Sequence, residues 1–129
     1  MILEPWTPDK YGEICGWWAA HKYPIIPERW LSPFGLIARS GSGDGLAACW
    51  LYFTGTPVAF IENLVSNPKA NKAIVSKAID AVIDGCTDMA RRSGCDVLLA
   101  TTDLSAVVQR TARIGFKSQR VWFLTKILR

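Results

Sequence analysis

The region that most constrains the fold is residues 72–101, where a long amphipathic pattern runs directly into a short apolar one. Between Lys72 and Ser93 the apolar residues recur every three or four positions, which is the period of one helix face. Gly94 follows as a helix-ending residue. Residues 96–101 then contain the continuous apolar run Val97-Leu98-Leu99-Ala100, which is typical of a strand covered on both faces. The pattern therefore predicts a long helix followed by a buried strand.

Three further strands are predicted before this helix, over residues 34–39, 45–54 and 58–65. A glycine-rich turn at 40–45 joins the first two, and the turn Thr54-Gly55-Thr56-Pro57 joins the second to the third. Such short connections predict an antiparallel meander. The third strand, the long helix and strand 96–101 then form a βαβ unit, whose two strands are parallel and whose crossover is right-handed.

The remaining segments complete the predicted order of elements. Residues 1–6 read as a strand, and Thr7-Pro8 starts a helix that ends near His21. Prolines limit residues 21–33 to one turn of helix at 27–31. A helix over 104–114, which begins after Asp103 or Thr102, and a last strand over 120–128 follow strand 96–101. We expect one α/β (α+β) domain over residues 1–129, in the order β-α-α-β-β-β-α-β-α-β.

Composition excludes several classes of protein. Half of the 129 residues are apolar and a fifth are charged, as in compact globular domains and unlike disordered or fibrous chains. Apolar runs such as Ala47–Phe53 are too short to cross a membrane, and the first residues lack the basic, apolar and small-residue pattern of a leader, so we expect none. We expect a soluble, cytoplasmic protein without a membrane partner. The four cysteines form no CxxC pair, so we expect reduced packing cysteines and no metal site.

Positive charge is concentrated at the C-terminal end. The net charge is +4, and no acidic residue follows Asp103. Six basic residues do: Arg110, Arg113, Lys117, Arg120, Lys126 and Arg129. A surface of this kind attracts phosphates, acidic proteins or nucleic acid, although it is equally consistent with a solvated face at the edge of a fold.

The order of elements and three short segments resemble the GCN5-related N-acetyltransferase (GNAT) superfamily. The segments are Ile61–Pro68 at the end of the third meander strand, Ala90–Gly94 at the end of the long helix, and Arg113-Ile114-Gly115-Phe116 before the last strand. The resemblance covers residues 1 to about 128 and suggests a small, divergent, bacteriophage-type member. It implies a mixed, mostly antiparallel sheet of about six strands, with a V-shaped splay between the fourth and fifth.

The resemblance also implies an activity. Members of the family transfer an acyl group from an acyl-coenzyme A (CoA) to an amine by direct attack in a ternary complex. Here we expect acetyl-CoA as the donor and a primary amine of a small molecule or protein as the acceptor, in a monomer or homodimer. In the family the pantetheine arm enters the splay, and a loop at the start of the long helix wraps the pyrophosphate. The corresponding residues are Leu64, Val65, Ser66, Lys69, Asn71, Lys72, Ala73, Ile74, Ser76 and Asp103.

This loop departs from the family pattern. Asn71 stands where the family has arginine or glutamine, and Lys72 and Ile74 stand where it has glycine, whereas Ser76 is suitably small. Lys69 and Lys72 offer point charges near a pyrophosphate. Alternatively, because Asn67-Pro68 is itself a good helix start, the helix begins there and leaves no loop.

Glu62 occupies the position of the family's strand base. Simple alternation places it on one face with Val58, Phe60 and Leu64. Either a bulge therefore rotates it, or the carboxyl lies beside apolar groups with a raised pKa. The other interpretation is an exposed edge residue paired with a lysine or arginine.

The other predicted site residues follow from the resemblance as well. Thr111 stands where the family has its acidic tyrosine, and it is a weaker acid, although a thiolate can leave unprotonated. His21, Tyr23 and Trp30 border the expected acceptor side, where a helix-capping histidine and packing aromatics are the alternative.

The competing hypothesis for function is a catalytically degenerate protein with the same fold. Such a phage effector or virion-associated protein would engage an acidic macromolecule through its basic C-terminal surface.

Overall fold

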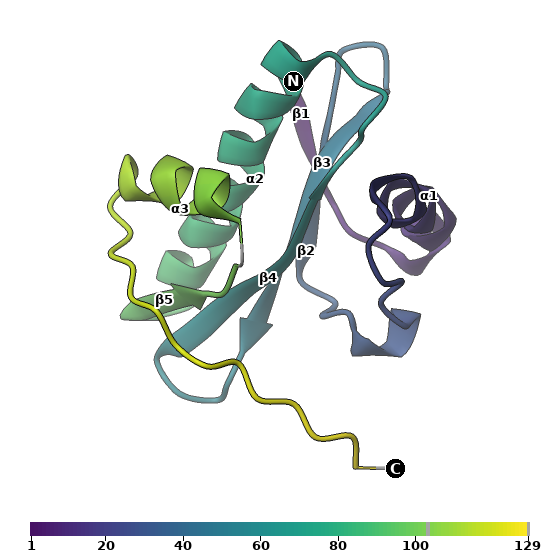
Figure 1. The fold of residues 1–129 in the computed structure, drawn as a ribbon. Helices are drawn as coiled ribbons and strands as arrows, with labels where there is room; N and C mark the ends of the chain where they lie inside the picture. Colours follow the sequence, from purple (N-terminus) through teal and green to yellow (C-terminus); the bar gives the residue numbers. More distant parts are fainter. Residues whose placement is uncertain (103, 129) are drawn as a thin grey trace.

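The computed structural model describes residues 1–102 and 104–128, and it shows a mixed α+β fold in which helices cover both faces of one sheet (Figure 1). The strands are β1 (Ile2–Pro5), β2 (Gly35–Arg39), β3 (Gly45–Phe53), β4 (Val58–Ser66) and β5 (Val97–Ala100). The helices are α1 (Tyr11–His21), α2 (Lys72–Arg92) and α3 (Ser105–Ala112), with single 3₁₀ turns at Pro8–Lys10 and Glu28–Trp30.

The strands lie side by side in chain order, β1-β2-β3-β4-β5. The first four are antiparallel to their neighbours, and β4 and β5 are parallel. The predicted meander and the parallel pair of the βαβ unit are thus confirmed. Because α2 connects β4 to β5, the start of this helix lies next to the end of β4, where the candidate site is built.

The core between α2 and the sheet is made of small and branched side chains. Cys49 of β3 meets Val82 and Cys86 of α2, and all three are fully buried. The two sulfur atoms lie 3.4 Å apart, and this contact together with burial raises the pKa of the Cys49 thiol. Each fully buried apolar side chain contributes about 1.5–3 kcal/mol to folding. The cysteines are unpaired packing residues, as the sequence predicted.

The other face of the sheet carries a tryptophan cluster. Trp50 of β3 is fully buried between Trp6 and Trp18, with ring centroids 5.4 and 6.0 Å away. Trp17 and Trp18 anchor α1 in this core. The close approach of Gly35 to the Trp50 ring leaves no room for a Cβ there, since an added Cβ would lie 2.5 Å from the indole.

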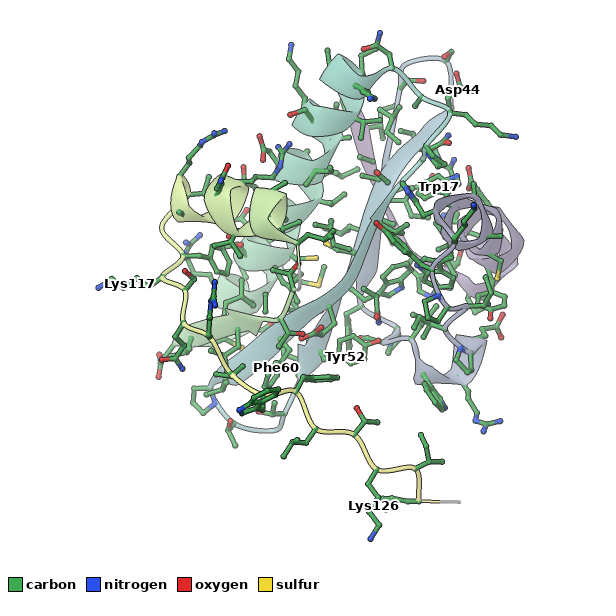
Figure 2. The ribbon with its side chains drawn as sticks, in the orientation of Figure 1. Trp17, Asp44, Tyr52, Phe60, Lys117 and Lys126 are labelled. Carbon is green, nitrogen blue, oxygen red and sulfur yellow. The ribbon has the colours of Figure 1, made fainter. Side chains whose placement is uncertain are left out.

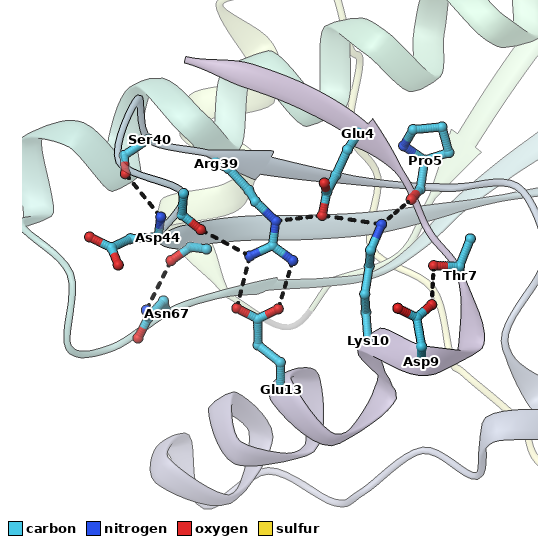
Figure 3. A network of polar contacts seen from close by, with 12 residues as sticks. Glu4, Pro5, Thr7, Asp9, Lys10, Glu13, Arg39, Ser40, Asp44 and Asn67 are labelled. Atoms are coloured by element: carbon cyan, nitrogen blue, oxygen red, sulfur yellow. Dashed lines mark hydrogen bonds and ion pairs between the residues drawn. The ribbon is translucent and has the colours of Figure 1, made fainter.

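Arg39 at the end of β2 fixes α1 relative to the sheet (Figure 3). Its guanidinium donates to both carboxylate oxygens of Glu13 in α1, at 2.8 and 3.0 Å, and to Glu4 in β1. Lys10 also pairs with Glu4, at 3.2 Å. The Arg39 guanidinium is the main cause that lowers the pKa of the Glu4 carboxyl. A bidentate contact such as that between Arg39 and Glu13 fixes the orientation of α1 better than a single ion pair would.

The C-terminal end differs from the prediction. Residues 120–128 belong to no strand, so the described part of the chain forms a sheet of five strands where about six were expected. Consequently β5 is an edge strand covered on one face only: Leu98 packs on the core, whereas Val97 and Leu99 are 47% and 42% exposed. The expectation of a strand covered on both faces is therefore wrong.

Within the described residues, no helix combines the length and the apolar character that a membrane crossing requires.

Candidate active site

The candidate site lies where the pairing of β4 with β5 ends. Their pairing runs from Val58 with Val97 to Ile61 with Ala100 and then stops, whereas β4 continues to Ser66 along β3. All four residues of β5 are paired, so the pairing stops where this strand ends, and the V-shaped splay stays a prediction. One backbone edge of residues 62–66 is left without a strand partner, and such groups need water, side chains or a ligand as partners. Ile74 at the start of α2 is 45% exposed.

A β-bulge lies at the branch point. Residues 63 and 64 of β4 stand opposite the single residue Cys49 of β3, and Asn63 has a φ of 63°. The extra residue reverses the alternation, so Leu64 packs against the α2 core, on the same side as Ile61. Simple alternation had predicted that Glu62 and Leu64 share a face, and this prediction is wrong. The bulge leaves Glu62 on the α1 side of the sheet.

Glu62 is half-buried, and Thr101 holds its carboxylate. The hydroxyl of Thr101, which directly follows β5, lies 3.0 and 3.2 Å from the two carboxylate oxygens and donates to them. Burial raises the pKa of the Glu62 carboxyl, and the Thr101 contact opposes that shift. No lysine or arginine among the described residues pairs with Glu62. A half-buried carboxyl without a basic partner is a candidate for proton transfer.

Two further polar side chains extend this cluster. Asn63 Nδ2 donates to the Tyr52 hydroxyl at 3.0 Å, and that hydroxyl donates to the Trp30 carbonyl at 2.9 Å. Burial raises the pKa of the Tyr52 phenol, and the charge of Glu62 adds to the shift. Tyr52 is paired with Phe60, and the two lie together toward one end of the sheet (Figure 2).

The sequence analysis did not single out Tyr52, Asn63 or Thr101. The available signals were weak: Tyr52 lies two residues after Trp50 on the same strand face, and Thr101 directly follows the apolar run of β5. We name Tyr52, Glu62, Asn63 and Thr101 the branch-point cluster.

His21 joins the end of α1 to the open edge of β4. Its Nε2 lies 2.9 Å from the Ser66 carbonyl, and its ring stacks on Tyr23 with centroids 4.9 Å apart. Tyr23 and Trp30 are 42% and 45% exposed. The structure thus brings His21 together with Ser66, and Trp30 with the branch-point cluster through its backbone.

The start of α2 decides between the two predicted paths of the chain. Asn71 caps the helix: its Oδ1 accepts from the amides of Ala73 and Ile74, at 2.9 and 3.3 Å. Asn67 instead stabilises a turn, accepting from the amide of Lys69 and donating to Gly45. A helix beginning at Asn67-Pro68 is therefore wrong, and a loop over residues 67–71 separates β4 from α2.

A surface hollow of about 400 Å³ adjoins this loop. Its lining includes Lys69 and Asn67 from the loop, and Glu13 and Asp44 from the opposite side. A second hollow, of about 580 Å³, lies over α2 between Leu3 and Phe116. Neither hollow is lined by a residue of the branch-point cluster.

The remaining predicted site residues lie away from the branch-point cluster or outside the described residues. Thr111 donates to the carbonyls of Val107 and Val108 within α3, at 2.8 and 3.2 Å. Val65 is buried in the tryptophan cluster. Lys72 and Ala73 are exposed in the first turn of α2. Asp103 lies outside the described residues.

Arg110 attaches α3 to α2. It forms an ion pair with Asp80 at 2.9 Å and donates to the carbonyl and the hydroxyl of Ser76, both at 3.0 Å. Arg110 is therefore not one of a set of unopposed bases, because its acidic partner lies earlier in the sequence, on α2.

Comparison by sequence gives no match, either to a protein-family model or to a curated protein. Comparison of structures does. An acetyltransferase from Trypanosoma brucei matches with a TM-score of 0.69 and 14% identity, covering 98% of this chain and 99% of that one. Rv2747 from Mycobacterium tuberculosis, in complex with CoA, matches with a TM-score of 0.74 and 13% identity, covering 97% and 76%.

A third match is AAC(6')-Iy in complex with the bisubstrate analog CoA-S-monomethyl-acetylneamine, with a TM-score of 0.66 and 17% identity over 98% of each chain. At such identities the likeness concerns the fold. Over nearly its whole length, the chain has the fold of the GNAT acetyltransferases.

Proposed function

We propose that this protein is an acyl-CoA-dependent N-acyltransferase that acts at the branch point of β4 and β5. The observation that carries the proposal is the position of Glu62: a half-buried carboxyl without a basic partner in the described structure, directly after the last β4 residue that pairs with β5. Its raised pKa suits a general base. Two of the neighbours with this fold are in complex with CoA or a CoA analog.

Glu62 takes a proton from the attacking primary amine, either directly or through one water. Bound acetyl-CoA supplies a thioester, so that a C–N bond forms at the carbonyl carbon, the C–S bond breaks and the thiolate leaves. Thr101 holds the Glu62 carboxylate in one orientation through its hydroxyl. Tyr52 and Asn63 provide a polar wall next to the base.

The open edge of β4 fits the amide-bearing arm of CoA. Residues 64–66 lie beyond the last β4–β5 pair, where backbone groups lack a neighbouring strand. Lys69 and Lys72, at and beyond the loop, are exposed and supply positive charge for the phosphates. The α2 amides of Ala73 and Ile74 already bond to Asn71, so the phosphates would depend more on these lysines than on the helix start.

The first experiment is calorimetric titration of the protein with acetyl-CoA. We expect saturable binding, and the absence of heat at millimolar ligand would refute the proposal. The second is release of CoA thiol in the presence of a panel of primary amines. Replacing Glu62 with glutamine should lower the rate about 10²- to 10⁴-fold with little change in acetyl-CoA affinity. An unchanged rate would remove Glu62 from the role of base.

The same titration also tests the alternative hypothesis, a catalytically degenerate binding protein with this fold. If acetyl-CoA does not bind, the exposed cations at Lys117, Arg120 and Lys126 make an acidic macromolecule the next ligand class to test. Binding to nucleic acid that weakens as salt is added would support this second function.

A further inference from the structure

We propose that His21 is a positioning residue for the acyl donor: its side chain holds Ser66 at the open edge of β4, where the amide-bearing arm of CoA would lie. The inference rests on the proposed function. It assigns His21 to the donor side of the site, whereas the resemblance had suggested the acceptor side.

The carbonyl of Ser66 points to the open edge of β4. The amide of Asn67, the next residue, donates to the Leu46 carbonyl of β3 at 2.9 Å. Main-chain groups of successive strand residues point to opposite sides, so those of Ser66 point away from β3. The pairing of β4 with β5 ends at Ile61, so among the described residues no strand reaches Ser66 on that side. Its amide and carbonyl therefore need other partners.

His21 is the partner of the carbonyl. Its Nε2 lies 2.9 Å from the Ser66 oxygen. Because a carbonyl oxygen only accepts, Nε2 carries the hydrogen of this bond and donates it. The Ser66 oxygen has a second lone pair, and the Ser66 amide points to the same edge. Both groups can therefore bond to an amide of a ligand while His21 stays in place.

The end of α1 fixes the imidazole. The amide of Tyr23 donates to the Trp18 carbonyl at 2.9 Å, and Lys22 has a φ of 62°, the left-handed conformation that commonly follows a helix end. Trp18 is buried in the tryptophan cluster, and the rings of His21 and Tyr23 stack with planes 11° apart. The imidazole is thus held by the helix and by the stacked ring, so it can hold the end of β4 in turn.

The length of β4 matches Ser66 to the second amide of the arm. At about 3.3 Å per strand residue, less one residue for the bulge, Ser66 lies about 10–13 Å along β4 from Glu62. The proposed function places the acyl carbon beside Glu62. An extended arm advances about 1.2 Å per bond, so its first amide nitrogen lies about 5 Å and its second about 10 Å from that carbon. Only the second amide therefore reaches Ser66.

Two substitutions separate the hydrogen bond from the packing of the ring. His21→Phe keeps a flat ring to stack on Tyr23 but has no N–H to donate, whereas His21→Gln loses the ring and keeps an N–H donor. We expect His21→Phe to bind CoA about three- to tenfold more weakly than the wild type in calorimetric titration, the effect of one neutral hydrogen bond. His21→Gln should bind CoA as the wild type does. Matching circular dichroism spectra check that all three proteins fold alike.

A short ligand provides the matched control. N-acetylcysteamine contains the first amide of the arm and ends before the second. Its affinity, measured by NMR titration, should be the same for the wild type and for His21→Phe. An equal loss of affinity for CoA and for N-acetylcysteamine would show a general disturbance of the site and overturn the proposal.

The remaining outcomes separate this proposal from the proposed function. If the wild type binds CoA and His21→Phe binds it equally well, or His21→Gln loses as much affinity as His21→Phe, the positioning role is overturned and the proposed function stands. If the wild type binds no CoA, both proposals are overturned. Long-range proton–nitrogen correlation NMR of the ligand-free protein tests the contact itself: we expect a hydrogen on His21 Nε2, and an imidazole that carries its hydrogen on Nδ1 alone overturns the positioning role.

Discussion

Asn71 is expected to contribute measurably to the stability of α2. Its side chain accepts from two backbone amides of the first helical turn, Ala73 at 2.9 Å and Ile74 at 3.3 Å. Replacing it with alanine removes both contacts and leaves the amides to water. Because the amides are exposed, the loss is that of an N-cap and not of a buried hydrogen bond.

The expected cost of Asn71→Ala is about 1 kcal/mol. For a chain of 129 residues, an unfolding entropy of about 2.1 cal/mol/K per residue gives roughly 270 cal/mol/K, so the Tm should fall by about 4 °C. Glycine is a tolerated cap, and Asn71→Gly should cost only a few tenths of a kcal/mol.

Thermal and urea unfolding followed by circular dichroism measure both variants. Lys72→Ala is the matched control, because Lys72 is the exposed next residue, and its loss should change stability by less than about 0.5 kcal/mol. The capping argument is refuted if Asn71→Ala is no less stable than Lys72→Ala, or if glycine costs as much as alanine.

Three further predictions concern the core, the candidate base and the attachment of α3. Gly35→Ala should destabilise the protein by at least about 2 kcal/mol, since the new Cβ would lie 2.5 Å from the Trp50 ring. Gly16 is an exposed position of α1 with no atom near the added Cβ, so Gly16→Ala should stabilise the protein by up to about 1 kcal/mol, and equal effects of the two changes in urea unfolding would contradict this. Burial raises the pKa of Glu62 above 4.5, so the folded state binds more protons than the unfolded state above that pH. The free energy of unfolding of the wild type, relative to that of Glu62→Gln, should therefore fall as the pH rises from about 4.5 through the folded pKa. A constant difference between the two proteins across this range would show that the pKa is not shifted. Arg110→Ala should increase amide hydrogen exchange throughout α3 and leave α2 protected, whereas uniform exchange in both helices would show that the ion pair with Asp80 and the bonds to Ser76 do not hold α3.

The sequence alone determined most of the element order. The helix predicted from Lys72 appears as α2, because a long apolar stripe at helical spacing has one way to be buried against a sheet. The strands of the meander also follow from local signals, since glycine and proline turns separate short apolar runs. These features depend on neighbours in the chain, which a sequence displays directly.

The site depended on tertiary structure. One extra residue at Asn63 reversed the alternation of β4 and placed Glu62 and Leu64 on opposite faces, and no turn residue or motif marked this bulge. Thr101 meets Glu62 because both residues directly follow the last of the four pairs between two parallel strands, although 39 residues separate them in sequence.

The C-terminal segment is a second feature that depended on tertiary structure. Its residues have the composition of a strand, yet 120–128 pairs with no other strand in the described structure. Composition gives the preference of a segment for extended backbone. Whether a strand forms depends on a neighbouring edge that lies within reach, and the fold of the whole chain decides where such an edge lies.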